Sequence, residues 1–278
     1  MHRSSVDAGD ESRALAADRF GEGPAVVLLH GQPGSRADWR RVVPLLEGDH
    51  TLVVPDRPGY GDTGGRALGF RENASAAVRL LDDLDVETAV FVGYSWSGGV
   101  ALSAAVHHPD RVSGMVLVAS VRPGEEPGWA DRMMAVPMVG EITGALTFGT
   151  TSRVLRMRRV QDLADRRLPR TARDAVKAMA GASKALSGAH VWQSFATEQR
   201  YLLSELAGLG SDLHRIEVPT VVVNGGSDRV VPAAVGARLA MAIPGAEFRV
   251  VPKAHHLLPF DRPEEIASAV RAVSAHPD

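Results

Sequence analysis

The feature that most constrains the fold is an alternation of short apolar runs with longer helix-like stretches. The apolar runs end at turn-forming Gly, Pro or Asp residues and lie at 25–29, 51–54, 89–92, 112–119, 218–223 and 247–251. Runs of this length are typical of strands buried on both faces of a sheet. The helix-like stretches lie at 36–46, 71–84, 98–107, 233–243 and 263–275. This alternation predicts an α/β fold with a mostly parallel, doubly wound sheet.

The alternation is interrupted over residues 122–212. This segment contains helix-like stretches broken by Pro and Gly, but no clear strand. A structureless loop of this length is uncommon inside a compact domain. We therefore expect 122–212 to form an inserted helical cap, with 1–121 and 213–278 forming the core domain. The cap would cover the carboxyl edge of the sheet, where open α/β sheets bind ligands.

The amino-acid composition of the chain argues against several classes of function. The 278 residues include no Cys, so the chain offers neither a thiolate nucleophile nor a Cys-ligated metal site. A formal net charge of −2 gives no reason to expect nucleic-acid or membrane-surface binding. The N-terminal residues lack the apolar run of a secretory signal, and no run approaches the roughly 20 residues that span a bilayer. We expect a cytoplasmic monomer or homodimer that binds a small molecule and involves no nucleic acid and no membrane insertion.

A serine stands at the apex of a strand–turn–helix segment. The run at 89–92 leads into Gly93-Tyr94-Ser95-Trp96-Ser97, and a helix-like stretch follows at once. Such a turn strains the serine, so the residues two before and two after it must be small. It also exposes the hydroxyl at a helix N-terminus, where backbone N–H groups stabilise negative charge. The segment resembles the Gly-x-Ser-x-Gly nucleophile elbow of the α/β-hydrolase family, with Ser97 where the second Gly is usual.

An acid and a base follow the serine in the order that this family uses. Asp228 comes shortly after the run at 218–223, and His256 precedes Pro263 in a loop near the C-terminus. His255 occupies a position where Gly is usual. The resemblance implies a catalytic triad, because a Ser hydroxyl needs an adjacent base and a carboxylate fixes the imidazole tautomer.

The resemblance also implies an oxyanion hole built from two backbone N–H groups. One belongs to Trp96, directly after the proposed nucleophile. The other belongs to Gln32, which follows His30-Gly31 after the first apolar run; the neighbouring Pro33 has no N–H to donate. We interpret His30 as a brace for this loop.

The identity of the nucleophile narrows the chemistry. Epoxide hydrolases and haloalkane dehalogenases have similar His-Gly-x-Pro loops but use an Asp, whereas position 95 is Ser. We predict a serine hydrolase that cleaves a small to medium, mostly apolar carboxylic ester, thioester or lactone through an acyl-enzyme on Ser95, with no metal and no cofactor. The alternatives are a C–C hydrolase of ring-cleavage dienones, a cofactor-free perhydrolase, a biosynthetic acyltransferase or cyclase, and a receptor-like binding protein. C–C hydrolases often have Trp after the catalytic His, where this chain has Leu257.

The predicted cap suggests how a substrate is selected. Residues 153–184 carry ten basic against three acidic side chains, which indicates either attraction of an anionic substrate or a solvated helical face. Soft and aromatic side chains elsewhere in the cap are candidates for an apolar substrate pocket. The candidates are Met133, Met134, Trp192 and Phe195.

Overall fold

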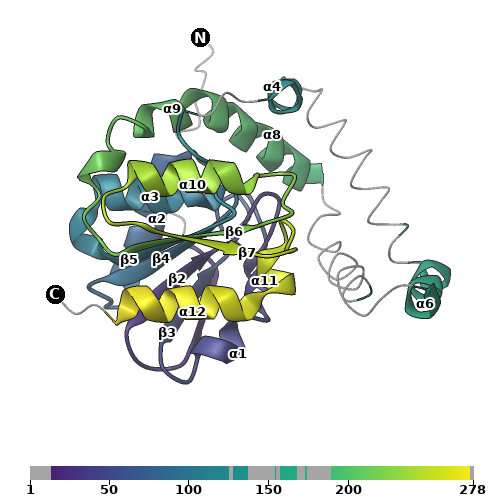
Figure 1. Cartoon of the computed structure of the whole chain (residues 1–278), viewed down its shortest axis with the longest axis horizontal. Coiled ribbons are helices and arrows are strands. Elements are labelled where there is room, and N and C mark those ends of the chain that lie inside the picture. Colours follow the sequence, from purple (N-terminus) through teal and green to yellow (C-terminus); the bar gives the residue numbers. More distant parts are fainter. Residues whose placement is uncertain are drawn as a thin grey trace, which may run out of the picture.

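The computed structural model describes residues 14–124, 128–136, 154, 157–167, 173 and 189–275. Within these residues the chain forms a seven-stranded sheet of order β1-β3-β2-β4-β5-β6-β7 (Figure 1). Only β1 runs antiparallel to its neighbour, and the other described pairings are parallel. The strands are β1 (Ala17–Phe20), β2 (Ala25–Leu29), β3 (Thr51–Pro55), β4 (Ala89–Tyr94), β5 (Val112–Val118), β6 (Thr220–Gly225) and β7 (Glu247–Val251).

Helices cover both faces of this sheet, which confirms the doubly wound α/β fold. One face packs against α2 (Phe70–Asp83), α3 (Ser97–His107) and α10 (Ala233–Ala242). The other face packs against α1 (Val43–Leu46), α11 (Leu258–Asp261) and α12 (Pro263–Ser274) (Figure 1).

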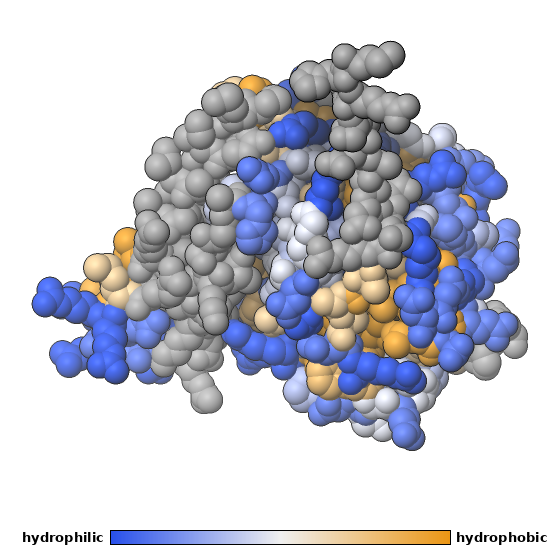
Figure 2. Space-filling model, turned by 180° about the vertical axis from the view of Figure 1, so that it is seen from behind, coloured by the Kyte–Doolittle hydropathy of each residue, from blue (hydrophilic) through white to orange (hydrophobic). Residues whose placement is uncertain are grey.

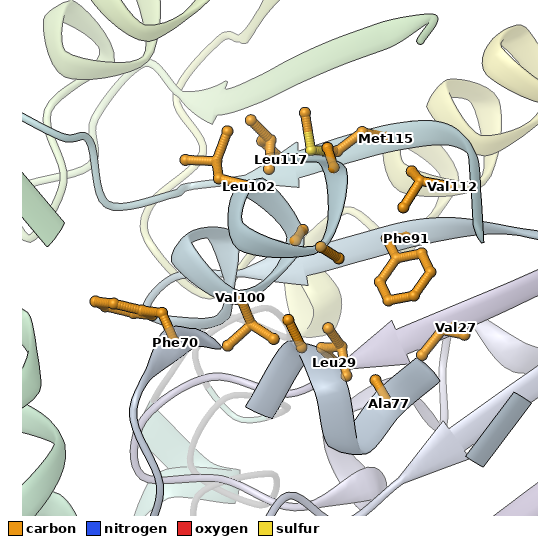
Figure 3. Close-up of a cluster of buried hydrophobic side chains, with 14 of the residues drawn as sticks. Val27, Leu29, Phe70, Ala77, Phe91, Val100, Leu102, Val112, Met115 and Leu117 are labelled. Atoms are coloured by element: carbon orange, nitrogen blue, oxygen red, sulfur yellow. The ribbon is translucent and has the colours of Figure 1, made fainter. Parts of the chain in front are cut away.

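The alternation of side chains along each strand divides the core between the two faces. Val27 and Leu29 of β2 point into the cluster under α2 and α3, whereas Val26 and Leu28 point into the cluster under α12. Figure 3 shows the first cluster, where strand side chains meet Ala77 of α2 and other helix residues. Because both faces are covered, the central strands read in the sequence as uninterrupted apolar runs.

The structure corrects three details of the predicted elements. Strand β1 was not predicted, because its residues do not form an apolar run. It is an edge strand that pairs only with β3, and its side chains are partly exposed. The run at 247–251 is a strand but is not buried on both faces, because β7 is the last strand of the sheet and Val250 is 46% exposed. The stretch 36–46 forms a 3₁₀ turn (Arg36–Trp39) followed by α1, since Pro44 has no N–H to continue a helix from Arg40.

The described part of 122–212 is helical. It contains α4 (Trp129–Ala135), α6 (Arg158–Arg167), α8 (Ala189–Ser204) and α9 (Leu206–Leu209). Helix α6 carries four arginines against two aspartates, and hydrophilic side chains gather at its end of the molecule (Figure 2). Much of the basic segment 153–184 lies outside the described residues. Among the residues that the structure does describe, no helix combines the length and apolarity needed to cross a bilayer.

Candidate active site

Ser95 sits at the tight turn between β4 and α3. Its backbone adopts a left-handed conformation with φ of 55°, which is strained for a residue with a side chain. Two hydrogen bonds secure the turn to the end of β5: Ser95 N–H donates to Val118 O at 2.8 Å, and Val121 N–H donates to Ser95 O at 3.2 Å. The turn also requires glycine at position 93, because a Cβ there would lie 2.4 Å from Ser97 O.

The structure brings Ser95, His256 and Asp228 together in one hydrogen-bonded chain. Ser95 Oγ lies 3.0 Å from His256 Nε2, and His256 Nδ1 lies 2.8 Å from Asp228 Oδ2. The carboxylate can only accept, so the imidazole proton sits on Nδ1 and the Nε2 lone pair faces the serine hydroxyl. This arrangement can remove the proton from Ser95 as its oxygen attacks an electrophile.

Asp228 is held in place by the backbone that follows it. Its side chain is fully buried, and its second oxygen, Oδ1, accepts N–H groups from Val230 at 2.8 Å and Val231 at 3.0 Å. These bonds satisfy the buried carboxylate and leave Oδ2 aimed at the imidazole. Asp228 is therefore placed to orient His256.

The two adjacent histidines occupy different environments. His255 is exposed, and its Nδ1 lies 3.1 Å from Ser227 O. His256 packs against Tyr94, with 5.5 Å between ring centroids, and its carbonyl accepts the Tyr94 hydroxyl at 3.2 Å. Burial raises the pKa of Tyr94 well above its ordinary value, so this phenol remains a hydrogen-bond donor. Only His256 of the pair contacts Ser95 among the described residues.

The loop of the predicted oxyanion donor Gln32 lies against α8. The Gln32 side chain donates through Nε2 to Phe195 O at 2.9 Å. Trp96, the other predicted donor, is 1% exposed, stacks on Phe70 at 4.2 Å between centroids, and donates its indole N–H to Glu198 O at 3.3 Å. Helix α8 thus contacts both residues to which the oxyanion hole was assigned.

His30 braces the first part of this loop in its neutral form. Its Nε2 accepts the backbone N–H of Arg57 at 3.0 Å, so Nδ1 carries the proton and donates to Gly31 O at 2.9 Å. Burial and the nearby guanidinium of Arg57 lower the pKa of His30 well below its usual value. A neutral imidazole can accept and donate at once, as these two bonds require.

A buried ion pair that sequence reasoning missed lies behind the same loop. The Arg57 guanidinium contacts the Glu198 carboxylate, and both side chains are almost fully buried. Tyr60 donates its hydroxyl to Glu198 at 2.7 Å, and the guanidinium lies 4.7 Å from the Trp96 ring centroid. Burial raises the pKa of Glu198, although Arg57 opposes the shift. No local pattern could reveal a pair separated by 141 residues.

The predicted pocket residues divide into two environments. Met133 is 49% exposed on α4, and Met134 is half-buried. Trp192 and Phe195 of α8 are buried, with ring centroids 6.1 Å apart. Their role in substrate binding stays a prediction. Within the described ranges, no group of His, Asp and Glu is arranged to hold a metal ion.

Comparison with known proteins establishes the family. Residues 26–269 match the family model described as the Alpha/beta hydrolase family. The chain belongs to this family. It is 29% identical to a 2-hydroxy-6-oxo-2,4-heptadienoate hydrolase of Pseudomonas putida, over 85% of this chain and 83% of that protein.

Solved structures give the same fold. The structure of Est816, described as an N-acyl homoserine lactone degrading enzyme, is 26% identical with a TM-score of 0.69 and covers 93% of this chain and 96% of that one. The structure of a thermophilic esterase from Thermogutta terrifontis is 23% identical with a TM-score of 0.70, and it covers 93% of this chain and 92% of that one. The family and these relatives support a hydrolase and leave the bond that it cleaves open.

Proposed function

We propose that the chain is a serine hydrolase that cleaves a small to medium, mostly apolar carboxylic ester, thioester or lactone. One observation carries the proposal: Ser95 Oγ lies 3.0 Å from His256 Nε2, while Asp228 holds the opposite ring nitrogen at 2.8 Å. A hydroxyl in this setting can act as a nucleophile at neutral pH, which an isolated serine cannot.

The proposed reaction uses each of these residues in turn. Ser95 Oγ bonds to the substrate carbonyl carbon as its proton passes to His256 Nε2, and the carbonyl oxygen becomes an oxyanion near the N–H groups of Gln32 and Trp96. His256 returns the proton to the departing alcohol or thiol as the tetrahedral intermediate collapses to an acyl-enzyme. Water then attacks the acyl carbon with His256 as base, which releases the acid and restores Ser95. Asp228 stabilises the transient imidazolium through its hydrogen bond to His256 Nδ1.

The similarity to a 2-hydroxy-6-oxo-2,4-heptadienoate hydrolase favours a second candidate, cleavage of a C–C bond in a ring-cleavage dienone. Against it stands Leu257 directly after His256, where C–C hydrolases often carry Trp. The similarity to the lactone-degrading enzyme favours the ester and lactone proposal instead. In either case the partner is a small molecule, and the apolar surface of Trp192 and Phe195 is proposed to contact it.

The test uses p-nitrophenyl acetate and p-nitrophenyl butyrate with the wild type and Ser95→Ala. We expect release of p-nitrophenol by the wild type and loss of that activity in the variant. A fluorophosphonate probe should label the wild type on the peptide that contains Ser95. Activity retained in Ser95→Ala, or labelling at another residue, would overturn the proposal. Ester hydrolysis that is absent while a dienone is cleaved would favour the C–C hydrolase.

A further inference from the structure

Two consecutive backbone carbonyls behind the oxyanion loop are held by side chains from three separate parts of the chain. His30 O accepts Arg57 Nε at 3.1 Å and the Ser97 hydroxyl at 2.5 Å. Gly31 O accepts Arg57 Nη2 at 3.0 Å and His30 Nδ1 at 2.9 Å. Each carbonyl therefore has both lone pairs occupied. Such complete occupation fixes the orientation of the two peptide planes.

The orientation of the Gly31 carbonyl determines the direction of the Gln32 N–H. Both groups belong to one planar peptide, and in a trans peptide the C=O and N–H point in opposite directions. Donors that hold Gly31 O on the buried side therefore turn Gln32 N–H away from that side. A preorganised donor stabilises an oxyanion without reorganising during the reaction. A small change in the direction of this N–H therefore lowers the reaction rate.

We propose that Arg57 and Ser97 are positioning residues that aim the Gln32 N–H at the oxyanion, and that Glu198 of α8 keeps Arg57 in place for this purpose. The inference rests on the proposed function, because it assigns a task within the same site. Arg57 bonds both carbonyls through its fork of N–H groups, a geometry that lysine cannot reproduce. Glu198 of α8 contacts the Arg57 guanidinium and supplies its counter-charge, and the Tyr60 hydroxyl donates to Glu198.

Ser97, where the elbow departs from Gly-x-Ser-x-Gly, takes part in this arrangement. Ser97 is fully buried, and its hydroxyl joins the first turn of α3 to the carbonyl of His30 on the oxyanion loop. A glycine there would fit the turn but would provide no such bond. Ser97 therefore couples the position of the nucleophile to the position of the oxyanion donors.

The matched test compares Ser97→Ala with Ser103→Ala. Both serines are fully buried on α3, but within the described part of the chain the Ser103 hydroxyl has no hydrogen-bond partner. Arg57→Lys is the second variant, since it keeps a cation beside Glu198 and loses the forked contact. The readouts are kcat and KM with p-nitrophenyl butyrate, the inhibition constant of an alkyl trifluoromethyl ketone, and Tm. Ser95 Oγ adds to the carbonyl carbon of the ketone as its proton passes to His256 Nε2, and the resulting hemiketal oxyanion lies near the N–H groups of Gln32 and Trp96.

We expect Ser97→Ala to lower kcat about tenfold and Arg57→Lys about 100-fold, with KM changed less than about threefold. The inhibition constant of the ketone should rise in parallel with the loss of kcat/KM, and Ser103→Ala should match the wild type in all kinetic values. Equal kinetics for Ser97→Ala and Ser103→Ala, or a change in Tm and KM alone, would overturn the inference. Failure of the proposed function is distinguished by a wild type that neither hydrolyses the ester nor binds the ketone at Ser95.

Discussion

Asp38 provides a test of the electrostatics around the oxyanion loop that needs no substrate. It lies on the 3₁₀ turn after this loop and is 6% exposed. Burial raises the pKa of its carboxyl to about 7, although the Ser35 N–H and the charge of Arg57 oppose the shift. The carboxyl is therefore protonated in the folded state at pH values where the unfolded chain has already lost the proton.

The sign of the resulting pH dependence follows from the raised pKa. Stability from protonated Asp38 is fully present below the unfolded pKa and is lost as the pH rises toward about 7. The interval from 3.8 to about 7 corresponds to about 4 kcal/mol, at about 1.4 kcal/mol for each pH unit. About 2–3 kcal/mol of this stability is lost between pH 5 and pH 8.

Asp38→Asn removes this cost because the amide is neutral at every pH and retains an oxygen for Ser35 N–H. The variant should gain stability over the wild type by about 2–3 kcal/mol more at pH 8 than at pH 5. Urea unfolding followed by tryptophan fluorescence at both pH values measures the difference. Asp83 is exposed on α2, and Asp83→Asn provides the matched control substitution. A gain for Asp38→Asn that is equal at pH 5 and pH 8 would refute the reasoning.

Three further predictions address the elbow, the acid and the ion pair between Asp49 and Arg271 of α12. Gly93→Ala should destabilise the fold by about 1–3 kcal/mol, because the new Cβ meets backbone atoms. At Gly208 a new Cβ meets nothing within 4 Å, so Gly208→Ala should stabilise the fold by about 0.5–1 kcal/mol. Urea unfolding measures the free energy of unfolding of both variants. Asp228→Asn should lower kcat for p-nitrophenyl butyrate about 10⁴-fold with little change in KM, and a loss below tenfold would contradict its role. Arg271 and His50 hold the pKa of Asp49 at about 2, so Asp49→Asn should destabilise at pH 7 and progressively less below pH 4. Unfolding at pH 7 and pH 3 checks this, and a constant difference would count against it.

The parts of the fold that follow from local chemistry could be predicted from the sequence. The central strands are covered on both faces, so β2 and β4 appear as apolar runs. The turn at Ser95 needs small neighbours and a following helix, and all of these are visible in consecutive residues. The candidate acid and base, Asp228 and His256, followed from their order along the chain and the resemblance to a known family.

Features that depend on position within the fold could not be predicted in the same way. Nothing in the run at 247–251 shows that β7 is the last strand of the sheet, so its burial was overestimated. The Arg57–Glu198 pair brings together a loop of the core and a helix of the predicted cap, and the two residues are separated by 141 positions along the chain. Ser97 was noticed only as a departure from glycine, because the carbonyl that it binds lies 67 residues away.

Trapping of the acyl-enzyme tests the central proposal most directly. The wild type is mixed with excess p-nitrophenyl butyrate, quenched in acid within the first turnovers, and analysed by intact-protein and peptide mass spectrometry. We expect one butyryl group per chain on the peptide that contains Ser95, and none in Ser95→Ala. Release of p-nitrophenol by Ser95→Ala at the wild-type rate, with the butyryl group on another residue, would contradict this expectation.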